Sequence, residues 1–236
     1  MNAVDLGVNL FVALFALADP IGNVPIFAAA TMGATAAQRR GVSGLIALTM
    51  IGFLTFFFLT GLALLEFFGI SLAAFRIAGG ILLLFLGLDM TRDDFLKTFS
   101  DVDPSNDPGD VRGYARRRFQ RLVVPIAIPL LIGPGAISAV IIQAGEASRI
   151  GPAGWGAGMA AILAVSAVTF ACFSVSGLIS RILGEVGMAI VVRVLGLILC
   201  ALAIQFIIVG LGEATNGFIT VGASAPYAGD GPGRSL

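Results

Sequence analysis

Uncharged apolar runs of membrane-spanning length recur along the chain. Because the hydrocarbon core of a bilayer is about 30 Å thick, a helix needs roughly 20 apolar residues to cross it. Four runs contain no charged residue, and they cover 41–65, 122–145, 150–180 and 194–212. Two more runs contain charges: 70–90 contains only Arg76 and Asp89, and the run near 5–30 is interrupted by Asp19. Numbered along the chain, the six runs begin near residues 5, 41, 70, 122, 150 and 194. The pattern predicts an all-α, polytopic membrane protein with six transmembrane helices.

Proline and glycine interrupt the first and fourth of these runs. The first reads Asp-Pro-Ile-Gly-Asn-Val-Pro over 19–25, and the fourth reads Pro-Leu-Leu-Ile-Gly-Pro-Gly over 129–135. Proline removes a backbone donor and glycine does not enforce helix, so we expect helices 1 and 4 to be discontinuous. Unwound backbone at membrane depth requires protein or a water-filled cavity around it. Both interruptions should therefore face the interior and one another, unless the prolines only kink their helices.

Two halves of the chain share a weak internal match. Residues 76–82 read Arg-Ile-Ala-Gly-Gly-Ile-Leu and residues 193–199 read Arg-Val-Leu-Gly-Leu-Ile-Leu, near the start of the third and sixth runs. Together with the paired interruptions, this match predicts two three-helix repeats, 1–90 and 122–212. Because three spans are an odd number, the second repeat enters from the opposite side, as in many secondary transporters. Chance similarity between apolar helices is the alternative.

Basic residues gather on one side of the predicted spans. Segment 91–121 is the one sizeable polar loop and contains seven Lys and Arg residues. Lys and Arg mark cytoplasmic loops, so we expect this loop in the cytoplasm and both termini outside it. Segment 213–236, rich in Gly, Pro and Ser, reads as a poorly ordered extracytoplasmic tail. The first run lacks a basic start and a small-residue cleavage site, which favours a retained span over a signal peptide.

Amino-acid composition argues against several classes of function. Hydrophobic residues make up 58% of the 236 residues and charged residues 12%, and the mean hydropathy is +1.00. With no His and zero net charge, nothing favours nucleic-acid binding, imidazole catalysis or a metal site. Cys172 and Cys200 lie in apolar runs without metal-ligand or disulfide spacing. We therefore expect lipid as the solvent, no cofactor and no metal, and we rank an intramembrane enzyme last.

The interruptions supply the candidate binding site for a polar solute. A broken helix exposes N–H groups that suit a carboxylate and carbonyls that suit a cation, and an amino acid carries both charges. Asp19 is the candidate for proton or sodium coupling, because a carboxylate within a span is costly and usually functional; the alternative is an N-cap for a half-helix beginning at Pro20. The substrate-binding candidates are Asp19, Pro20, Gly22, Asn23, Pro25, Gly133, Pro134, Gly135 and Ser138.

Other polar residues within the spans are weaker candidates for the binding site. Arg76, Arg193 and Asp89 are secondary candidates, for which snorkelling or structural pairing is the alternative. In the fifth run, Ser166 and Thr169 begin a helical stripe that continues through Phe173, Ser176 and Ser180. Such a stripe can line a pathway or hold helices together.

The residues from Asp19 to Phe27 and from Ile128 to Ser138 resemble the signatures of the MarC family, over about residues 4–212. The resemblance implies an inner-membrane protein of six helices, distantly similar to the lysine exporter superfamily. It also implies transport of small neutral amino acids such as glycine and alanine. A non-transporting membrane assembly or regulatory protein is the alternative. The sequence leaves the oligomeric state, the coupling ion and the direction of transport open.

Overall fold

The computed structural model describes residues 2–92, 111–122 and 131–215, and these residues form eight α-helices and no strand. Helices α3, α4 and α8 and residues Ala189–Ala214 of α9 are each long and apolar enough to cross a membrane. The protein is thus an all-helical membrane protein. The helices are α1 (Ala3–Ala18), α2 (Val24–Ala30), α3 (Ala36–Phe68), α4 (Leu72–Thr91), α6 (Val111–Leu122), α7 (Pro134–Ile150), α8 (Pro152–Ser174) and α9 (Gly177–Ala214).

Local sequence signals set several helix ends. Thr35 caps α3 and forms a reciprocal capping box with Gln38, and Ser71 accepts the Ala74 N–H at the start of α4. Gly69 ends α3 with φ of 64°, a left-handed conformation that glycine adopts without a steric penalty. Gly69 and Ser71 therefore flank the short connection between α3 and α4.

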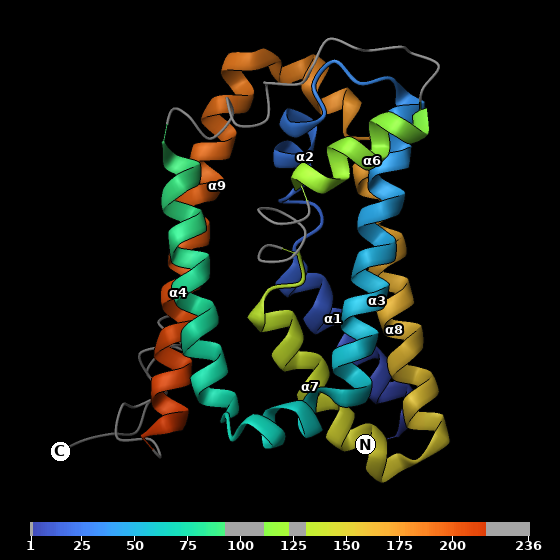
Figure 1. Cartoon of the computed structure of the whole chain (residues 1–236), viewed down its shortest axis with the longest axis vertical. Coiled ribbons are helices and arrows are strands. Elements are labelled where there is room, and N and C mark those ends of the chain that lie inside the picture. Colours follow the sequence, from blue (N-terminus) through green and yellow to red (C-terminus); the bar gives the residue numbers. More distant parts are fainter. Residues whose placement is uncertain (1, 93–110, 123–130, 216–236) are drawn as a thin grey trace, which may run out of the picture.

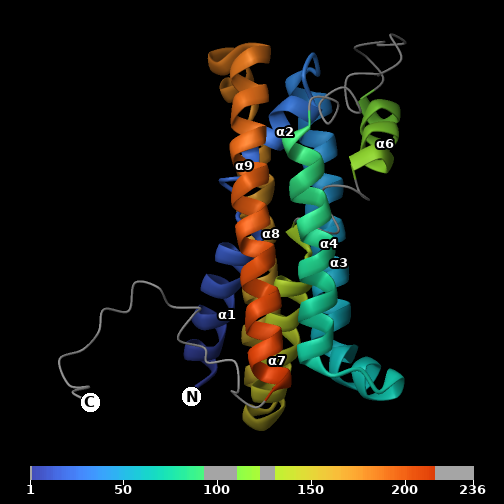
Figure 2. The same cartoon turned by 90° about the vertical axis from the view of Figure 1, so that its left-hand side faces the viewer.

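The long helices form two pairs, with the shorter ones between them. Helix α4 packs along α9, and α3 packs along α8, while α1, α2 and α7 lie between the pairs (Figure 1). The side view shows the same bundle from the side of α4 and α9, and α6 lies near one end of the bundle, where it packs on α3 (Figure 2). Glycine allows the α4–α9 contact, because a Cβ at Gly80 or Gly87 would lie 2.7 Å from α9 atoms. Such close backbone approach is typical of helix packing in membranes.

The core lies between the pairs and the shorter helices. Leu6, Leu10 and Leu14, spaced by four residues on α1, are fully buried. The Phe27 ring on α2 stacks on the Phe173 ring of α8 with centroids 4.4 Å apart. Large apolar side chains cover the outer surface, as expected where the solvent is lipid.

Helix α9 differs from the predicted sixth run. It begins at Gly177 rather than near residue 194, and Gly184, with φ of 62°, interrupts it. The charged residues that ended the apolar run do not prevent helix formation. The predicted polar loop is described only at its two ends, and the predicted tail lies almost wholly outside the described residues, as do residues 123–130 before α7.

Candidate functional site

The first interruption lies between α1 and α2. Helix α1 ends at Ala18, and α2 begins at Val24 with Pro25 in its first turn. Asp19 has φ of 39° and is the one described residue other than glycine with a positive φ. This left-handed conformation costs an L-residue roughly 1–2 kcal/mol. Proline at position 20 has no N–H to donate to a continued helix.

Side-chain hydrogen bonds of Asp19 and Asn23 stabilise this interruption. The Asp19 carboxylate accepts the Gly22 N–H at 3.0 Å, and the Asn23 amide donates to the Ala18 carbonyl at 2.8 Å. A Cβ at Gly22 would lie 2.0 Å from the Asp19 carboxylate, so a side chain there would displace the carboxylate from its present position. The expected N-cap role of Asp19 is wrong: Asp19 is the C-cap of α1, and Asn23 occupies the N-cap position of α2.

The second interruption borders the start of α7. Gly133 is the N-cap residue without a side-chain cap, and Pro134 occupies the first turn. Pro134 packs so closely on α4 that a Cβ at Gly79 would lie 2.0 Å from its ring. Gly135 lies against Phe206 of α9 and Leu17 of α1. Three helices therefore fix the position of the α7 N-terminus.

A cavity of about 350 Å³ opens beside this N-terminus. It is lined by Gly135, Ser138 and Gln143 of α7, together with Arg76 of α4 and Gln205 of α9. Ser138 is 1% exposed, and its hydroxyl has no hydrogen-bond partner among the described residues; the same holds for the Gln143 side-chain oxygen. Buried polar atoms normally have partners, so two such atoms in one cavity indicate a place for a polar ligand.

Arg76, which lines this cavity, forms an ion pair with Glu213. Its guanidinium donates to the Glu213 carboxylate near the end of α9. Arg76 is the more buried partner, with 17% of its side chain exposed against 42% for Glu213. Glu213 does not line the cavity, but it balances the charge of Arg76, which does.

A second, smaller cavity of about 40 Å³ borders the first interruption. Asp19 and Asn23 line it, facing Met90 of α4 and apolar residues of α9. Leu17 lines both cavities and therefore lies between them. Asp19 is exposed in the single chain rather than enclosed, and Leu17, two residues before it, lies against Gly135 in the described part of the second interruption.

The remaining sequence candidates lie away from these cavities. Asp89 pairs with Arg92 at 3.4 Å on the exposed end of α4, and Arg193 is exposed on α9. Neither lines the two cavities. Pro20 is buried in the α1–α2 turn, where it shapes the backbone.

Of the hydroxyl residues in the predicted stripe, only Ser166 and Thr169 lie on α8. The Ser166 and Thr169 hydroxyls are fully buried and donate to the carbonyls of Ile162 and Val165 in their own helix. These hydroxyls are satisfied within the helix, as is common for Ser and Thr in membrane spans. Ser176, which the sequence placed on the same stripe, lies beyond the end of α8, and its buried hydroxyl has no hydrogen-bond partner among the described residues.

Two buried arginines, missed from the sequence, bind the carbonyl end of α2. Arg118 of α6 donates to the Ala30 carbonyl, and Arg39 of α3 donates to the Thr31 carbonyl and hydroxyl at 3.3 Å. Cations are favourable at a helix C-terminus. Burial raises the pKa of the neighbouring Tyr114 phenol, while Arg118 and Arg39 act in the opposite direction. Helix α6 is thereby attached to the C-terminal end of α2.

Comparison with known proteins decides the family. A family model described as MarC family integral membrane protein matches residues 5–215. The chain belongs to the MarC family. This MarC protein is 33% identical over 206 residues to the UPF0056 membrane protein YvbG of Bacillus subtilis, covering 86% of this chain and 93% of YvbG. No solved structure matches it.

Similar MarC relatives occur in distant organisms. A UPF0056 membrane protein of Methanocaldococcus jannaschii is 34% identical over 206 residues, which cover 86% of this chain and 95% of the relative. Another, from Buchnera aphidicola, is 32% identical over 217 residues, which cover 90% of this chain and 94% of the relative. These relatives are named as membrane proteins, in agreement with the apolar helices of this chain.

Proposed function

We propose that this MarC protein is a secondary transporter of small neutral amino acids, of the glycine and alanine type, across the cytoplasmic membrane. In this proposal the chain crosses the membrane six times in two inverted three-helix halves. Segment 91–121 lies in the cytoplasm and both termini lie outside. The substrate binds between the interrupted helices 1 and 4, and a proton or sodium gradient drives its movement.

The observation that carries the proposal is the cavity of about 350 Å³ with its unpartnered Ser138 and Gln143 oxygens. The first-turn N–H groups of α7 have no acceptor within the helix, so they suit a substrate carboxylate. The Ser138 hydroxyl can donate to the same carboxylate, and the Gln143 oxygen can accept from the substrate ammonium. Each end of a zwitterion would thus meet a suitable group.

The rest of the lining favours a small, neutral side chain. Leu17, Ala139, Ile142 and Phe206 supply apolar surface, which suits a methyl group or hydrogen. A charged side chain would lack a free counter-charge here, because Arg76 and Glu213 pair with each other. Burying an unpaired charge is costly, so the site discriminates against acidic and basic amino acids.

The helix arrangement supports the two-half proposal. Helix α3 lies with α8, α4 lies with α9, and α1 contacts α7, so each proposed counterpart packs on its equivalent in the other half (Figure 1). Movement of one half against the other around the site would give alternating access. Asp19, beside the first interruption and separated from the larger cavity by Leu17, is the proposed coupling group.

Uptake by proteoliposomes tests the proposal. Purified protein should accumulate labelled alanine and glycine when a proton or sodium gradient is imposed, and unlabelled lysine or glutamate should not compete. Ser138→Ala should lower uptake, whereas Ser166→Ala should not, because the Ser166 hydroxyl is satisfied within α8. If no alanine or glycine enters under any gradient and neither raises the Tm, the transport proposal is wrong.

A further inference from the structure

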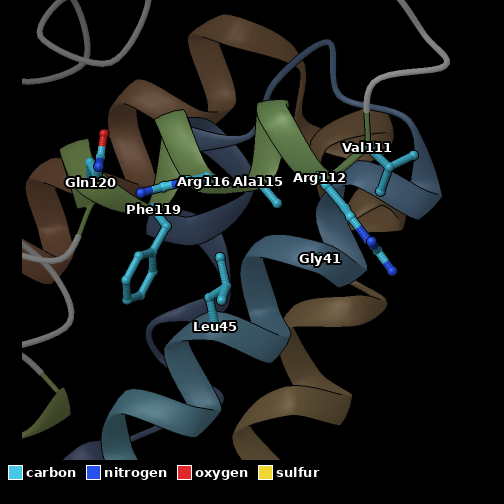
Figure 3. Close-up of a pocket in the computed structure, with 8 residues that line it drawn as sticks. All are labelled: Gly41, Leu45, Val111, Arg112, Ala115, Arg116, Phe119 and Gln120. Carbon is cyan, nitrogen blue, oxygen red and sulfur yellow. The ribbon is translucent and has the colours of Figure 1, made fainter.

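A groove of about 520 Å³ lies between α3 and α6, away from the proposed transport site. The two helices touch at Gly41 and Ala115, where a Cβ at position 41 would lie 3.0 Å from the Ala115 methyl. Beyond this contact the helices diverge. Figure 3 shows the Leu45 and Phe119 side chains facing the space between them, with Arg112 extending beside the helix that carries Gly41.

The groove has an apolar floor and a basic edge. Val111, Ala115 and Phe119 recur every four residues on α6 and face α3, and the adjacent row carries Arg112, Arg116 and Gln120. Arg112 and Arg116 are exposed, and no carboxylate lies among the described residues that line the groove. Residues four apart on a helix lie on one face, so the two arginines can contact one ligand together.

The apolar floor continues along α3 into the membrane-spanning surface. Leu48 follows Leu45 on the same face and is 65% exposed, and no atom lies within 4 Å of a Cβ at Gly52. The groove therefore opens onto the apolar outer face of α3. Gly41 also marks the point where the charged start of α3, including exposed Arg40, gives way to the uncharged run 41–65. This is the expected level of the lipid headgroups.

We propose that the α3–α6 groove binds one anionic diacyl phospholipid, with its phosphate between Arg112 and Arg116 and an acyl chain along Leu45 and Leu48. Charge complementarity selects the occupant: guanidinium groups bind phosphate strongly, and basic sites at the cytoplasmic surface recognise anionic headgroups. A zwitterionic lipid would supply the same chains without net negative charge. Because α6 is attached to α2 through Arg118, a bound lipid would also hold α6 in place.

The test measures lipid binding to delipidated, purified full-length protein by native mass spectrometry. Dioleoyl phosphatidylglycerol should bind more tightly than dioleoyl phosphatidylcholine. R112Q/R116Q should weaken phosphatidylglycerol binding about thirty-fold, because each basic residue near an anionic lipid contributes roughly five-fold, and should leave phosphatidylcholine binding unchanged. The matched control, R92Q/R149Q, removes two exposed arginines outside the groove and should bind like the unaltered protein.

A second variant tests the apolar half of the site. Leu45→Trp should fill the groove and weaken phosphatidylglycerol binding, whereas Leu62→Trp, on an exposed position of the same helix, should not. Glycerol 3-phosphate, which carries the phosphate without chains, should bind far more weakly than the lipid. Equal binding of the two lipids, an R112Q/R116Q variant that keeps full phosphatidylglycerol affinity, or arginine-dependent binding of an oligonucleotide in place of lipid would overturn the proposal.

Discussion

Gly79→Ala tests whether α4 sets the position of the α7 N-terminus and, with it, the proposed substrate site. A Cβ at position 79 would lie 2.0 Å from both Cβ and Cγ of Pro134, whereas ordinary contact begins at 3.4 Å. The two helices would have to separate by at least 1.4 Å, the difference between these distances. Ser138 lies one turn further along α7, so its hydroxyl would move as well.

The loss of unfolding free energy caused by Gly79→Ala follows from the steric overlap with Pro134. Overpacking a well-filled contact destabilises a protein by about 1–3 kcal/mol. For a chain of this size, that corresponds to a fall in Tm of about 2–12 °C. A displacement of about 1 Å at a positioned binding group can lower activity about 100-fold, so alanine uptake should fall at least about ten-fold.

Thermal unfolding in detergent and uptake by proteoliposomes measure the two effects. Gly52→Ala on α3 is the matched control, since no atom lies within 4 Å of a Cβ there. This control should retain uptake and keep or raise the Tm, because Ala favours helix over Gly by about 1 kcal/mol. If Gly79→Ala matches the unaltered protein in both Tm and uptake, α4 does not fix the α7 N-terminus.

Three further predictions concern the rest of the molecule. Asp19→Asn retains an oxygen for the Gly22 N–H, so it should keep its Tm but lose the ion dependence of alanine uptake; unchanged ion dependence would exclude Asp19 as the coupling group. Arg118→Met leaves the Ala30 carbonyl without its donor and should lower the unfolding free energy by about 1–3 kcal/mol, seen as a lower Tm; an unchanged Tm would show that α6 does not stabilise the first span. A reporter fused after Gly212 should lie outside the cytoplasm, and a cytoplasmic reporter would contradict two inverted halves.

The apolar runs predicted much of the fold, because hydropathy over 20 residues reports directly on membrane solvation. The run at 41–65 lies within α3, the run at 70–90 covers all of α4 except its last residue, and the run at 194–212 lies within α9. The start of α9 could not be placed this way, since charges end an apolar run without ending a helix. Hydropathy also gives no sign of the left-handed residue at Gly184.

The candidate site was predicted in part. Gly135, Ser138 and Arg76 were candidates from the sequence, and they line one cavity in the structure. The sequence did not single out Gln143, which appeared as one polar residue in an apolar run. Its importance depends on the absence of a hydrogen-bond partner among the described residues, a property of tertiary packing.

Long-range contacts account for what the sequence missed. Loop arginines were interpreted as orientation signals, yet Arg118 is 4% exposed and donates to a carbonyl 88 residues away. Local preference also suggested an N-cap as the alternative role of Asp19, because Asp before Pro favours an N-cap. In the structure the carboxylate instead accepts the Gly22 N–H and closes the turn after α1.

The central claim is that the cavity beside the α7 N-terminus holds the transported amino acid. Ala139, a half-buried residue of this cavity, can be replaced by cysteine after both native cysteines are changed to alanine. Modification of Ala139→Cys by a small thiol reagent should slow when alanine is added. Ala153→Cys, on the exposed start of α8, should react at the same rate with and without alanine. Equal modification of Ala139→Cys with and without alanine, in protein that still takes up alanine, would place the substrate elsewhere.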